Sequence, residues 1–215
     1  MVPASKSSKH VIYLEAALCS LGFIVFSYFI HHGFPFVIIS FIGLAFPALI
    51  MSRQFNSPAD ISQVFGLLLS RKKSWYLLVG LQLGLIYSIA YRNVTDVPMF
   101  PKYLTWFAIT ASLIGAAEEL IFRGFFQEYF KRINTGFAVL FATSLHTAYK
   151  CFLFLSPVHT IEVNIQLLFI FTFAAGLFLG LLKEFSKSII PAIIAHVIFD
   201  ILVYGECLQP PWWVW

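Results

Sequence analysis

The chain has few charged residues. Asp, Glu, Lys and Arg make up only 11% of its 215 residues, whereas 60% are hydrophobic and the mean hydropathy is +0.84. Soluble globular domains carry about 25% charged residues. This shortage excludes a soluble domain of ordinary composition. We therefore predict an integral membrane protein whose immediate partner is the lipid bilayer, with the cell (plasma) membrane as its location.

Cysteine is scarce as well. Cys19, Cys151 and Cys207 are far apart and no CxxC pair occurs, which excludes a disulfide framework and a zinc knuckle. The chain carries a net charge of +4, but its Lys and Arg residues fall mostly in short gaps between apolar runs. That distribution is typical of membrane topology and not of a nucleic-acid surface, so we expect no nucleic-acid partner.

Seven apolar stretches reach or approach the length of about 17–25 residues that a spanning helix needs. They are Val11–Ile30, Phe34–Met51, Ser74–Tyr91, Leu104–Phe126, Phe137–Leu155, Ile165–Leu182 and Ile189–Tyr204. We therefore predict an all-α fold, a polytopic transmembrane helical bundle of about seven spans. The second and seventh stretches are the short ones.

The basic residues predict the orientation. With a cytoplasmic N-terminus, ten of them fall on the cytoplasmic side and only Arg92 and Lys102 outside, which is the expected positive-inside bias. The ten are Lys6, Lys9, Arg53, Arg71, Lys72, Lys73, Lys131, Arg132, Lys183 and Lys187. Apolar residues at helical spacing over 57–69 indicate either an amphipathic helix on the cytoplasmic leaflet or the lower end of the third span.

The spans divide into three regions. Residues 1–103 hold the first three spans and a cytoplasmic loop, and residues 104–204 hold four spans with every strongly polar intramembrane cluster. Residues 205–215 form a tail whose three tryptophans suit an aromatic belt at the outer interface. We expect residues 104–204 to be the functional core.

The fourth span contains three charges: Glu118, Glu119 and Arg123. Each Asp, Lys or Arg placed centrally in a membrane costs about 2.5–3.5 kcal/mol even on the gentlest insertion scale, so such residues need partners and a purpose. His146 lies in the fifth span, and His196 with Asp200 in the seventh. Glu118, His146 and His196 all fall roughly 12–14 Å from the cytoplasmic edge at about 1.5 Å rise per residue. They therefore share one layer, at a depth that favours cytoplasmic access.

Spacing within the helices predicts specific contacts. Glu119 and Arg123 are i and i+4 and should form an ion pair, leaving Glu118 free of it. His196 and Asp200 are also i and i+4, so the Asp should orient the imidazole. The pair Gly176 and Gly180, together with the small residues Ala111, Ser112, Gly115, Ala116 and Ala117, favours close helix packing.

These groups suit hydrolysis of an amide. Glu118 with His146 can activate a water molecule, and His196 can hold the oxyanion of a tetrahedral intermediate. Carboxylate-bridged metal bundles use Glu-x-x-His pairs, which are absent, so we expect no metal and no cofactor. Glu15 in the first span is predicted to be a packing or snorkelling residue.

Two other classes of function stay open. A proton-coupled transporter would use Glu118, Glu119 and the histidines as a relay, but it would place polar groups along the whole depth of the bundle and often show repeated halves. The sequence shows one polar layer and no repeat, which favours an enzyme. A membrane scaffold or immunity protein without catalysis would keep the same motifs and no turnover.

The motif Glu118-Glu119-x-x-x-Arg123, a His in the next span and His196-x-x-x-Asp200 resemble the glutamic intramembrane proteases of the CPBP or Abi family, which include the CAAX prenyl endopeptidases. The resemblance covers about residues 104–204. It implies an intramembrane, metal-independent endopeptidase that cuts a membrane-embedded or lipid-anchored protein substrate.

The resemblance also implies roles for individual residues. Glu118 and His146 would activate water, Glu119 and Arg123 would support Glu118, and His196 with Asp200 would complete an oxyanion site. Two positions depart from the family pattern. Ala142 stands where the family has Phe, with Phe141 one place earlier, and Asp200 stands where many members have Asn. An ionised Asp cannot donate a hydrogen bond, so we expect Asp200 to orient His196.

Overall fold

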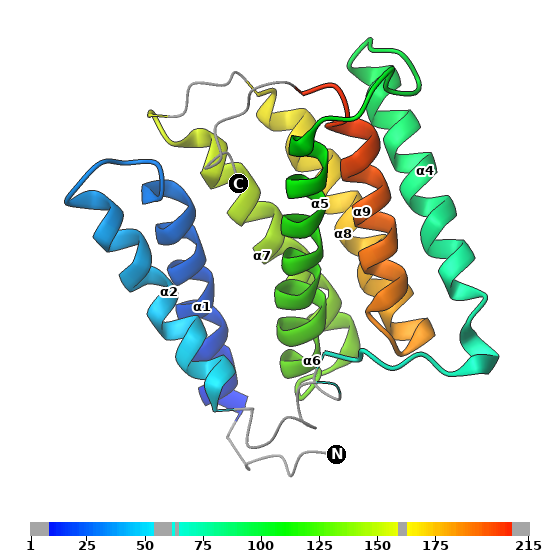
Figure 1. Cartoon of the computed structure of the whole chain (residues 1–215). Helices are drawn as coiled ribbons and strands as arrows, with labels where there is room; N and C mark the ends of the chain where they lie inside the picture. The colour runs from blue at the N-terminus through cyan, green and yellow to red at the C-terminus, as the bar shows by residue number, and fades with distance from the viewer. Residues whose placement is uncertain (1–8, 54–61, 63–64, 159–162, 208–215) are drawn as a thin grey trace.

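The computed structural model describes residues 9–53, 62, 65–158 and 163–207, and the regular structure in this part of the chain is helical. A helix occupies each of the seven predicted stretches (Figure 1). The long helices are α1 Lys9–Phe29, α2 Phe36–Ser52, α4 Tyr76–Val94, α5 Trp106–Glu119, α7 Thr135–Leu155, α8 Ile165–Ser186 and α9 Ile190–Val203. A 3₁₀ turn, η1 Arg71–Lys73, precedes α4.

Four helical segments are long and apolar enough to cross a membrane, and α2 and α9 are shorter apolar helices. The four are Lys9–Phe29, Arg71–Val94, Thr135–Leu155 and Ile165–Ser186. Large apolar side chains also lie exposed on outward faces, such as Ile42 of α2, Leu78 of α4 and Ile170 of α8, each at least 60% exposed. Such faces suit contact with lipid. The protein is thus an all-helical integral membrane protein, while seven crossings, the cytoplasmic N-terminus and the three-region division stay predictions.

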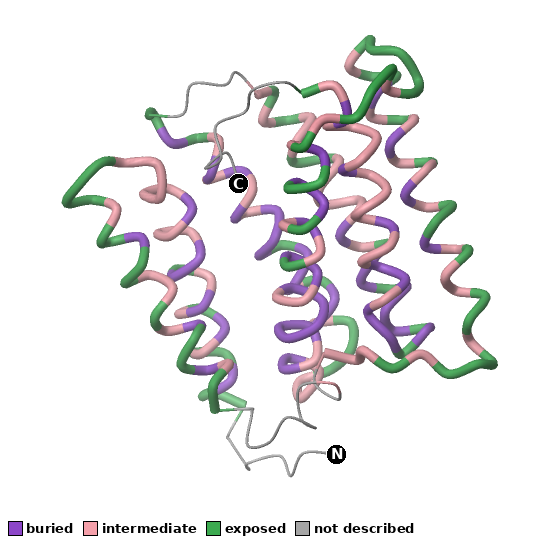
Figure 2. Tube along the Cα trace, in the orientation of Figure 1, coloured by how far each residue is buried: buried purple, intermediate pink, exposed green. Residues whose placement is uncertain are grey.

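The long helices pack in pairs. The α1–α2 hairpin contacts the rest through α1 on α7, and α4 packs on α9 at the other side (Figure 1). Between them α5 packs on α9 and α7 packs on α8. Buried residues gather along the lower part of α5 and along α7, whereas α2 and α4 at the two sides bury few (Figure 2). The core therefore lies where the predicted polar residues lie.

The fourth predicted span is not one regular helix. After Glu119 the chain continues as a π-helix, η2 Leu120–Phe126, and then as a short α-helix, α6 Gln127–Phe130. The i→i+5 pattern is rare and often marks functional sites. Periodicity did not predict it. A π segment widens the turn just after the two acids and changes which side chains of the helix face the bundle.

An aromatic cluster holds η2 in place. Phe122, Phe125 and Phe126 are fully buried. Phe122 and Phe126 pack on Phe23 of α1, Phe122 also packs on Tyr149 of α7, and Phe125 packs on Phe126. Phe122 also stacks on the His146 ring with the centroids 4.5 Å apart. These rings remove a large apolar area from lipid or water on the face of η2 away from its charges, so they fix the direction in which the charges point.

The two ends of the bundle differ in charge. We call the end that carries Lys9, Arg53, the η1 residues Arg71–Lys73, Lys131 and Lys187 the basic end, and the end that carries Thr95, Asn164 and Tyr204 the opposite end. At the opposite end, Arg92 is buried and lies 3.1 Å from Glu206, while its other donors reach the carbonyls of Pro98 and Leu202. The Lys102 backbone N–H and Arg92 lower the pKa of Glu206. Arg92 is thus a buried cation that joins the end of α4 to the loop that follows it and to the end of α9.

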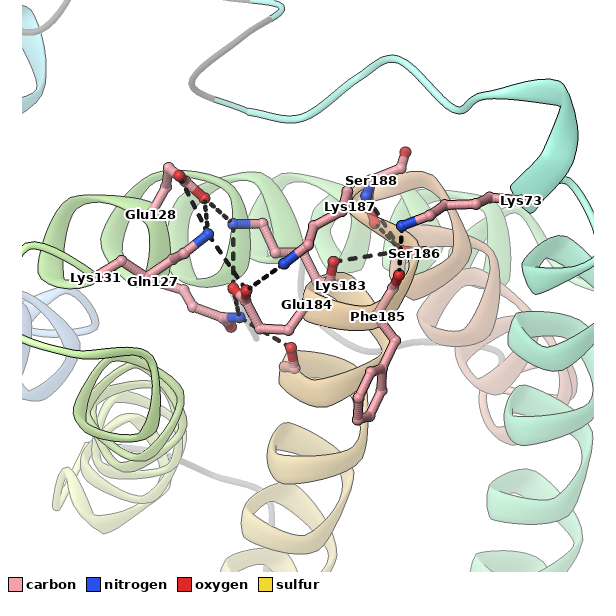
Figure 3. Close-up of polar contacts among 11 residues, drawn as sticks. Lys73, Gln127, Glu128, Lys131, Lys183, Glu184, Phe185, Ser186, Lys187 and Ser188 are labelled. Atoms are coloured by element: carbon pink, nitrogen blue, oxygen red, sulfur yellow. Dashed lines mark hydrogen bonds and ion pairs between the residues drawn. The ribbon is translucent and has the colours of Figure 1, made fainter. Parts of the chain in front are cut away.

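A second polar layer lies at the basic end (Figure 3). Gln127 donates to the Gly180 carbonyl and to Glu184, and Lys183 pairs with Glu128. Lys131 lies 3.3 Å from Glu184 and 3.1 Å from Glu128. These residues lie just past the predicted ends of the fourth and sixth spans, Phe126 and Leu182, so the prediction of one polar layer within the spans did not include them. The helices α6 and α8 bring them together.

Two sequence predictions outside the core have mixed outcomes. Glu15 accepts a hydrogen bond from Tyr129, so it is a packing residue, as predicted. The amphipathic segment at 57–69 lies largely outside the described residues. Its described end is not helical: Phe65 lies beside Gly124, and the Gly66 carbonyl accepts from the Ile189 N–H at 2.9 Å. The helix of the third span thus does not extend back through residues 65–70. The tryptophans of the C-terminal tail also lie outside the described residues.

Candidate active site

Glu118, from the last turn of α5, lies against His146 of α7. Its Oε2 is 3.1 Å from His146 Nε2, and both side chains are at most 5% exposed. Arg123, from η2, reaches the other side of the same ring, with Nη1 2.7 Å from Nδ1. Both the acid and the imidazole that the spacing placed at one depth therefore meet in one cluster.

The Arg123 contact decides the tautomer of His146. A guanidinium has donors only, so Nδ1 accepts and the ring proton lies on Nε2. Nε2 must then donate to the Glu118 carboxylate. His146 is held as a neutral donor, and the proton acceptor of this pair is Glu118. The sequence alone did not separate the two roles.

The ion pair predicted between Glu119 and Arg123 is confirmed, at 3.0 Å between Oε1 and Nη1, with both groups fully buried. The same Oε1 accepts from His196 Nδ1 at 2.9 Å. A carboxylate that already pairs with a guanidinium is a strong acceptor, so it fixes the tilt of the imidazole. Glu119 therefore joins η2 to α9.

Asp200 does not orient His196 through a hydrogen bond, contrary to the prediction. Its Oδ2 is 3.7 Å from Nε2, while Glu119 holds Nδ1. Nε2 also faces Glu118 Oε2, at 3.9 Å. The i,i+4 pattern placed Asp200 on the right face of α9, but a carboxylate from another helix lies closer. His196 Nε2 is thus directed at the space between Glu118 and Asp200.

Lys150 is a site residue that sequence reasoning missed. Its Nζ lies 2.6 Å from Glu118 Oε1. Glu118 is therefore outside the Glu119–Arg123 pair, as predicted, but forms an ion pair of its own with Lys150. We had treated Lys150 only as a charge inside a span. The signal was present, because Lys150 is i+4 from His146 and therefore shares its helix face. Glu118 has a cation on one oxygen and an imidazole on the other.

Gly115 makes room for the α9 residues. A Cβ at this position would lie against Asp200 Oδ2 and 2.9 Å from His196 Cδ2. Arg123 and Thr143 crowd Gly176 in the same way, and Gln127 crowds Gly180. The small residues predicted to allow close approach of helices therefore do so at the cluster itself.

We expect Gly115→Ala to lower activity by about 10²-fold, because small displacements of positioned groups have effects of this size. The measurement is the cleavage rate of purified protein at equal folded concentration. Gly136→Ala is the matched control, since its Cβ would approach only Asn134 Oδ1, at 3.4 Å. Equal rates for wild type and Gly115→Ala would contradict the packing argument.

A cavity of about 420 Å³ opens beside the cluster. Its polar floor comprises Glu119, Arg123, His146, Lys150, His196 and Asp200. Its walls are aromatic and aliphatic side chains of α4, α8 and α9, such as Tyr87, Phe171 and Phe199. Glu118 lies behind this floor, in contact with His146 and Lys150. An apolar cavity with a few convergent polar groups is the usual form of a binding site.

The two departures from the family pattern now have a structural setting. Phe141 packs against Phe130 at 4.4 Å and against Phe137 at 5.7 Å, away from the polar cluster, while Ala142 is fully buried. The presence of Phe at position 141 instead of 142 therefore changes packing away from the polar cluster and leaves the groups of the cluster itself unchanged.

In the described part of the chain no group of three or more His, Cys, Asp or Glu residues has a geometry that would hold a metal ion.

Comparison with known proteins supports the family. Residues 100–202 match the family model described as type II CAAX prenyl endopeptidase Rce1-like, and this segment contains all six predicted site residues as well as Lys150. No curated protein and no solved structure matches the chain. The match agrees with the resemblance that the Glu-Glu-x-x-x-Arg and His-x-x-x-Asp motifs carry. Residues 100–202 thus belong to the Rce1-like family of CAAX proteases, within an integral membrane protein.

Proposed function

We propose that the protein is a glutamic intramembrane endopeptidase that hydrolyses a peptide bond of a membrane-embedded or lipid-anchored protein. The observation that supports this most is the meeting of Glu118, His146 and His196, from three helices, beside a cavity. The family match supports proteolysis of a membrane-anchored substrate. We also propose that the protein works in the cell membrane.

In the proposed reaction a water molecule bridges Glu118 Oε2 and His196 Nε2, which are 3.9 Å apart, from one side of the line that joins them. Lys150 pairs with Oε1 of the carboxylate, and Oε2 takes a proton from the water as the water oxygen attacks the peptide carbonyl carbon. The carbonyl oxygen becomes an oxyanion, to which His196 Nε2–H donates. Glu118 then gives its proton to the amide nitrogen, the C–N bond breaks, and a carboxylic acid and an amine leave; the acid then loses its proton to the amine or to solvent.

The other groups of the cluster position Glu118 and His196. Arg123 holds His146 so that Nε2–H points at Glu118, and it holds Glu119 so that His196 is turned toward the water. Three carboxylates face His196, and Glu119 accepts from its Nδ1–H, so Nε2–H is the donor that is directed at the oxyanion. Asp200 contributes charge and not a hydrogen bond in this arrangement.

A proton relay is the weaker alternative. The second polar layer at the basic end brings polar groups to two depths, as a transporter would. However, the member of that layer nearest to Arg123 along the helix is Gln127, and an amide side chain does not titrate. The described helices also show no repeated halves. We therefore retain hydrolysis as the proposal.

Comparing the membrane proteomes of cells that make wild-type protein and cells that make Glu118→Gln tests the proposal. We expect at least one membrane protein to carry a new terminus only with wild type, and its uncut form to accumulate with the variant. Identical termini in the two samples, with both proteins present at equal levels, would overturn proteolysis as the function.

Metal chelators are expected to leave the cleavage rate within about twofold of its starting value. The donor atoms are already occupied by cations: Lys150 Nζ lies 2.6 Å from Glu118, and Arg123 Nη1 lies 2.7 Å from His146 Nδ1. A divalent ion would meet two positive charges there. The measurement is activity after EDTA treatment, together with metal content by mass spectrometry. Activity lost to EDTA and restored by Zn²⁺ would contradict this prediction.

A further inference from the structure

We propose that the substrate enters the site from the opposite end of the bundle, so that cleavage takes place on the extracytoplasmic side of the membrane. This inference rests on the proposed function and adds the side of access and the kind of segment that is cut. It reverses the expectation of cytoplasmic access, which came from depth alone.

The direction of the cavity is the first argument. The lining begins at mid-depth and continues to the opposite end on three helices: α4 lines the cavity from Leu83 onward, α7 from His146 to Phe154, and α9 from Ala195 onward. The last residue of α5, Glu119, and Arg123 of η2 line its floor. Along α8 the lining begins at the first turn and ends at Leu179. Described residues at the mouth include Thr95, Asn164 and Cys207. The cavity thus runs from mid-depth to the opposite end.

The basic end is closed beneath the site. The network of Gln127, Glu128, Lys131, Lys183 and Glu184 ties α6 to α8 across this end (Figure 3). Lys73 adds a bond from η1 to the Phe185 carbonyl at 2.8 Å. A substrate arriving from this end would have to break several ion pairs among partly buried groups, which is costly.

The charge distribution assigns a side to each end. Nine described basic residues lie at the basic end: Lys9, Arg53, Arg71, Lys72, Lys73, Lys131, Arg132, Lys183 and Lys187. At the opposite end Arg92 is only 2% exposed and paired with Glu206, so among the residues described there Lys102 is the exposed lysine or arginine. The positive-inside rule then places the basic end in the cytoplasm, and the cavity mouth faces outward.

The walls of the cavity indicate what enters. Tyr87 and Tyr91 of α4 face Phe171 of α8 in edge-to-face contacts, and Phe178 and Phe199 extend this aromatic lining. Such walls suit an apolar protein segment that arrives from the outer leaflet, with its peptide group carried down to the polar floor. The substrate class is therefore a membrane protein with an apolar segment beside the scissile bond on its outer side.

Labelling with membrane-impermeant thiol reagents in intact cells tests the direction. Cys207 is exposed at the mouth, whereas Cys19 and Cys151 are buried. Two probes are added in a Cys207→Ser background: Ala175→Cys in the cavity wall and Lys72→Cys at the basic end. We expect Cys207 and Ala175→Cys to react in intact cells, and Lys72→Cys only after permeabilisation. Reaction of Lys72→Cys in intact cells, or no reaction of Ala175→Cys there, would overturn the inference.

The new termini provide a second, independent result. If cleaved proteins appear in the comparison of wild type with Glu118→Gln, their cut sites should map to the extracytoplasmic ends of spans. Cut sites on the cytoplasmic side would overturn this inference and leave proteolysis intact. Outward labelling without any cleaved protein would instead overturn the proposed function, and with it extracytoplasmic cleavage, while the outward opening of the cavity would stand.

Discussion

Glu118→Gln is expected to lower the rate of substrate cleavage by about 10³-fold or more, with the protein still folded. The amide keeps the shape of the side chain but cannot take a proton from water, and loss of a general base typically costs about 10²–10⁴-fold. The amide also loses the negative charge opposite Lys150, at 2.6 Å, so a smaller loss of stability accompanies the effect. The measurement is single-turnover cleavage by purified protein.

Glu128→Gln is the matched control for this prediction. The side chain of Glu128 is 40% exposed and belongs to the network at the basic end, away from the cavity floor. Its substitution should leave the cleavage rate near that of wild type and affect stability only. A Glu118→Gln protein that cleaves normally would remove Glu118 from the mechanism.

Arg123→Ala is expected to reduce both the yield of folded protein and its activity. The guanidinium is 1% exposed and joins Glu119 to His146. Removing one partner of a buried ion pair typically costs about 3–5 kcal/mol, because the other charge is left buried without compensation. The measurements are expression level, thermal unfolding in detergent and cleavage rate per folded molecule.

Arg123→Lys separates charge from geometry. A lysine keeps the positive charge but lacks the planar fork that reaches Glu119 and His146 together, so the yield should recover more than the activity. Arg53→Ala, at an exposed arginine, should change neither. Wild-type yield and activity in Arg123→Ala would contradict the role of the ion pair.

Local spacing predicted those parts of the site that lie within one helix. The ion pair of Glu119 with Arg123 follows from i,i+4 geometry and is present. Apolar length predicted the position of every long helix in the described part of the chain. Depth arithmetic indicated that residues of α5, α7 and α9 share a layer, because the rise per residue is the same in every helix.

Contacts between helices were harder to predict. Asp200 was expected to orient His196, but Glu119 holds that ring, because the distance between α5 and α9 is set by Gly115 and not by spacing along α9. Lys150 was overlooked as a partner of Glu118 for the same reason. Rotation of one helix about its axis relative to another is a tertiary property that a single hydrophobic pattern does not determine.

The π segment η2 and the direction of the cavity also escaped prediction. A π-helix has no distinct residue signature, and the aromatic packing of Phe122, Phe125 and Phe126 on α1 and α7 determines it only in the folded bundle. Likewise, Lys183 was counted only as a basic residue on the cytoplasmic side, although with Glu128 and Glu184 it closes that end. The depth of the polar residues along their helices predicted how far into the membrane the site lies, but it did not predict the end of the bundle at which the cavity opens.

The central claim is that Glu118 and His196 act as one unit on a single water molecule. Single-turnover cleavage rates of Glu118→Gln, His196→Ala and the double variant test it most directly, because residues that act as a unit show strongly non-additive losses. We predict that the double variant is no slower than the slower single variant, within about threefold. Losses that multiply in the double variant would show that the two residues act separately and would contradict the account.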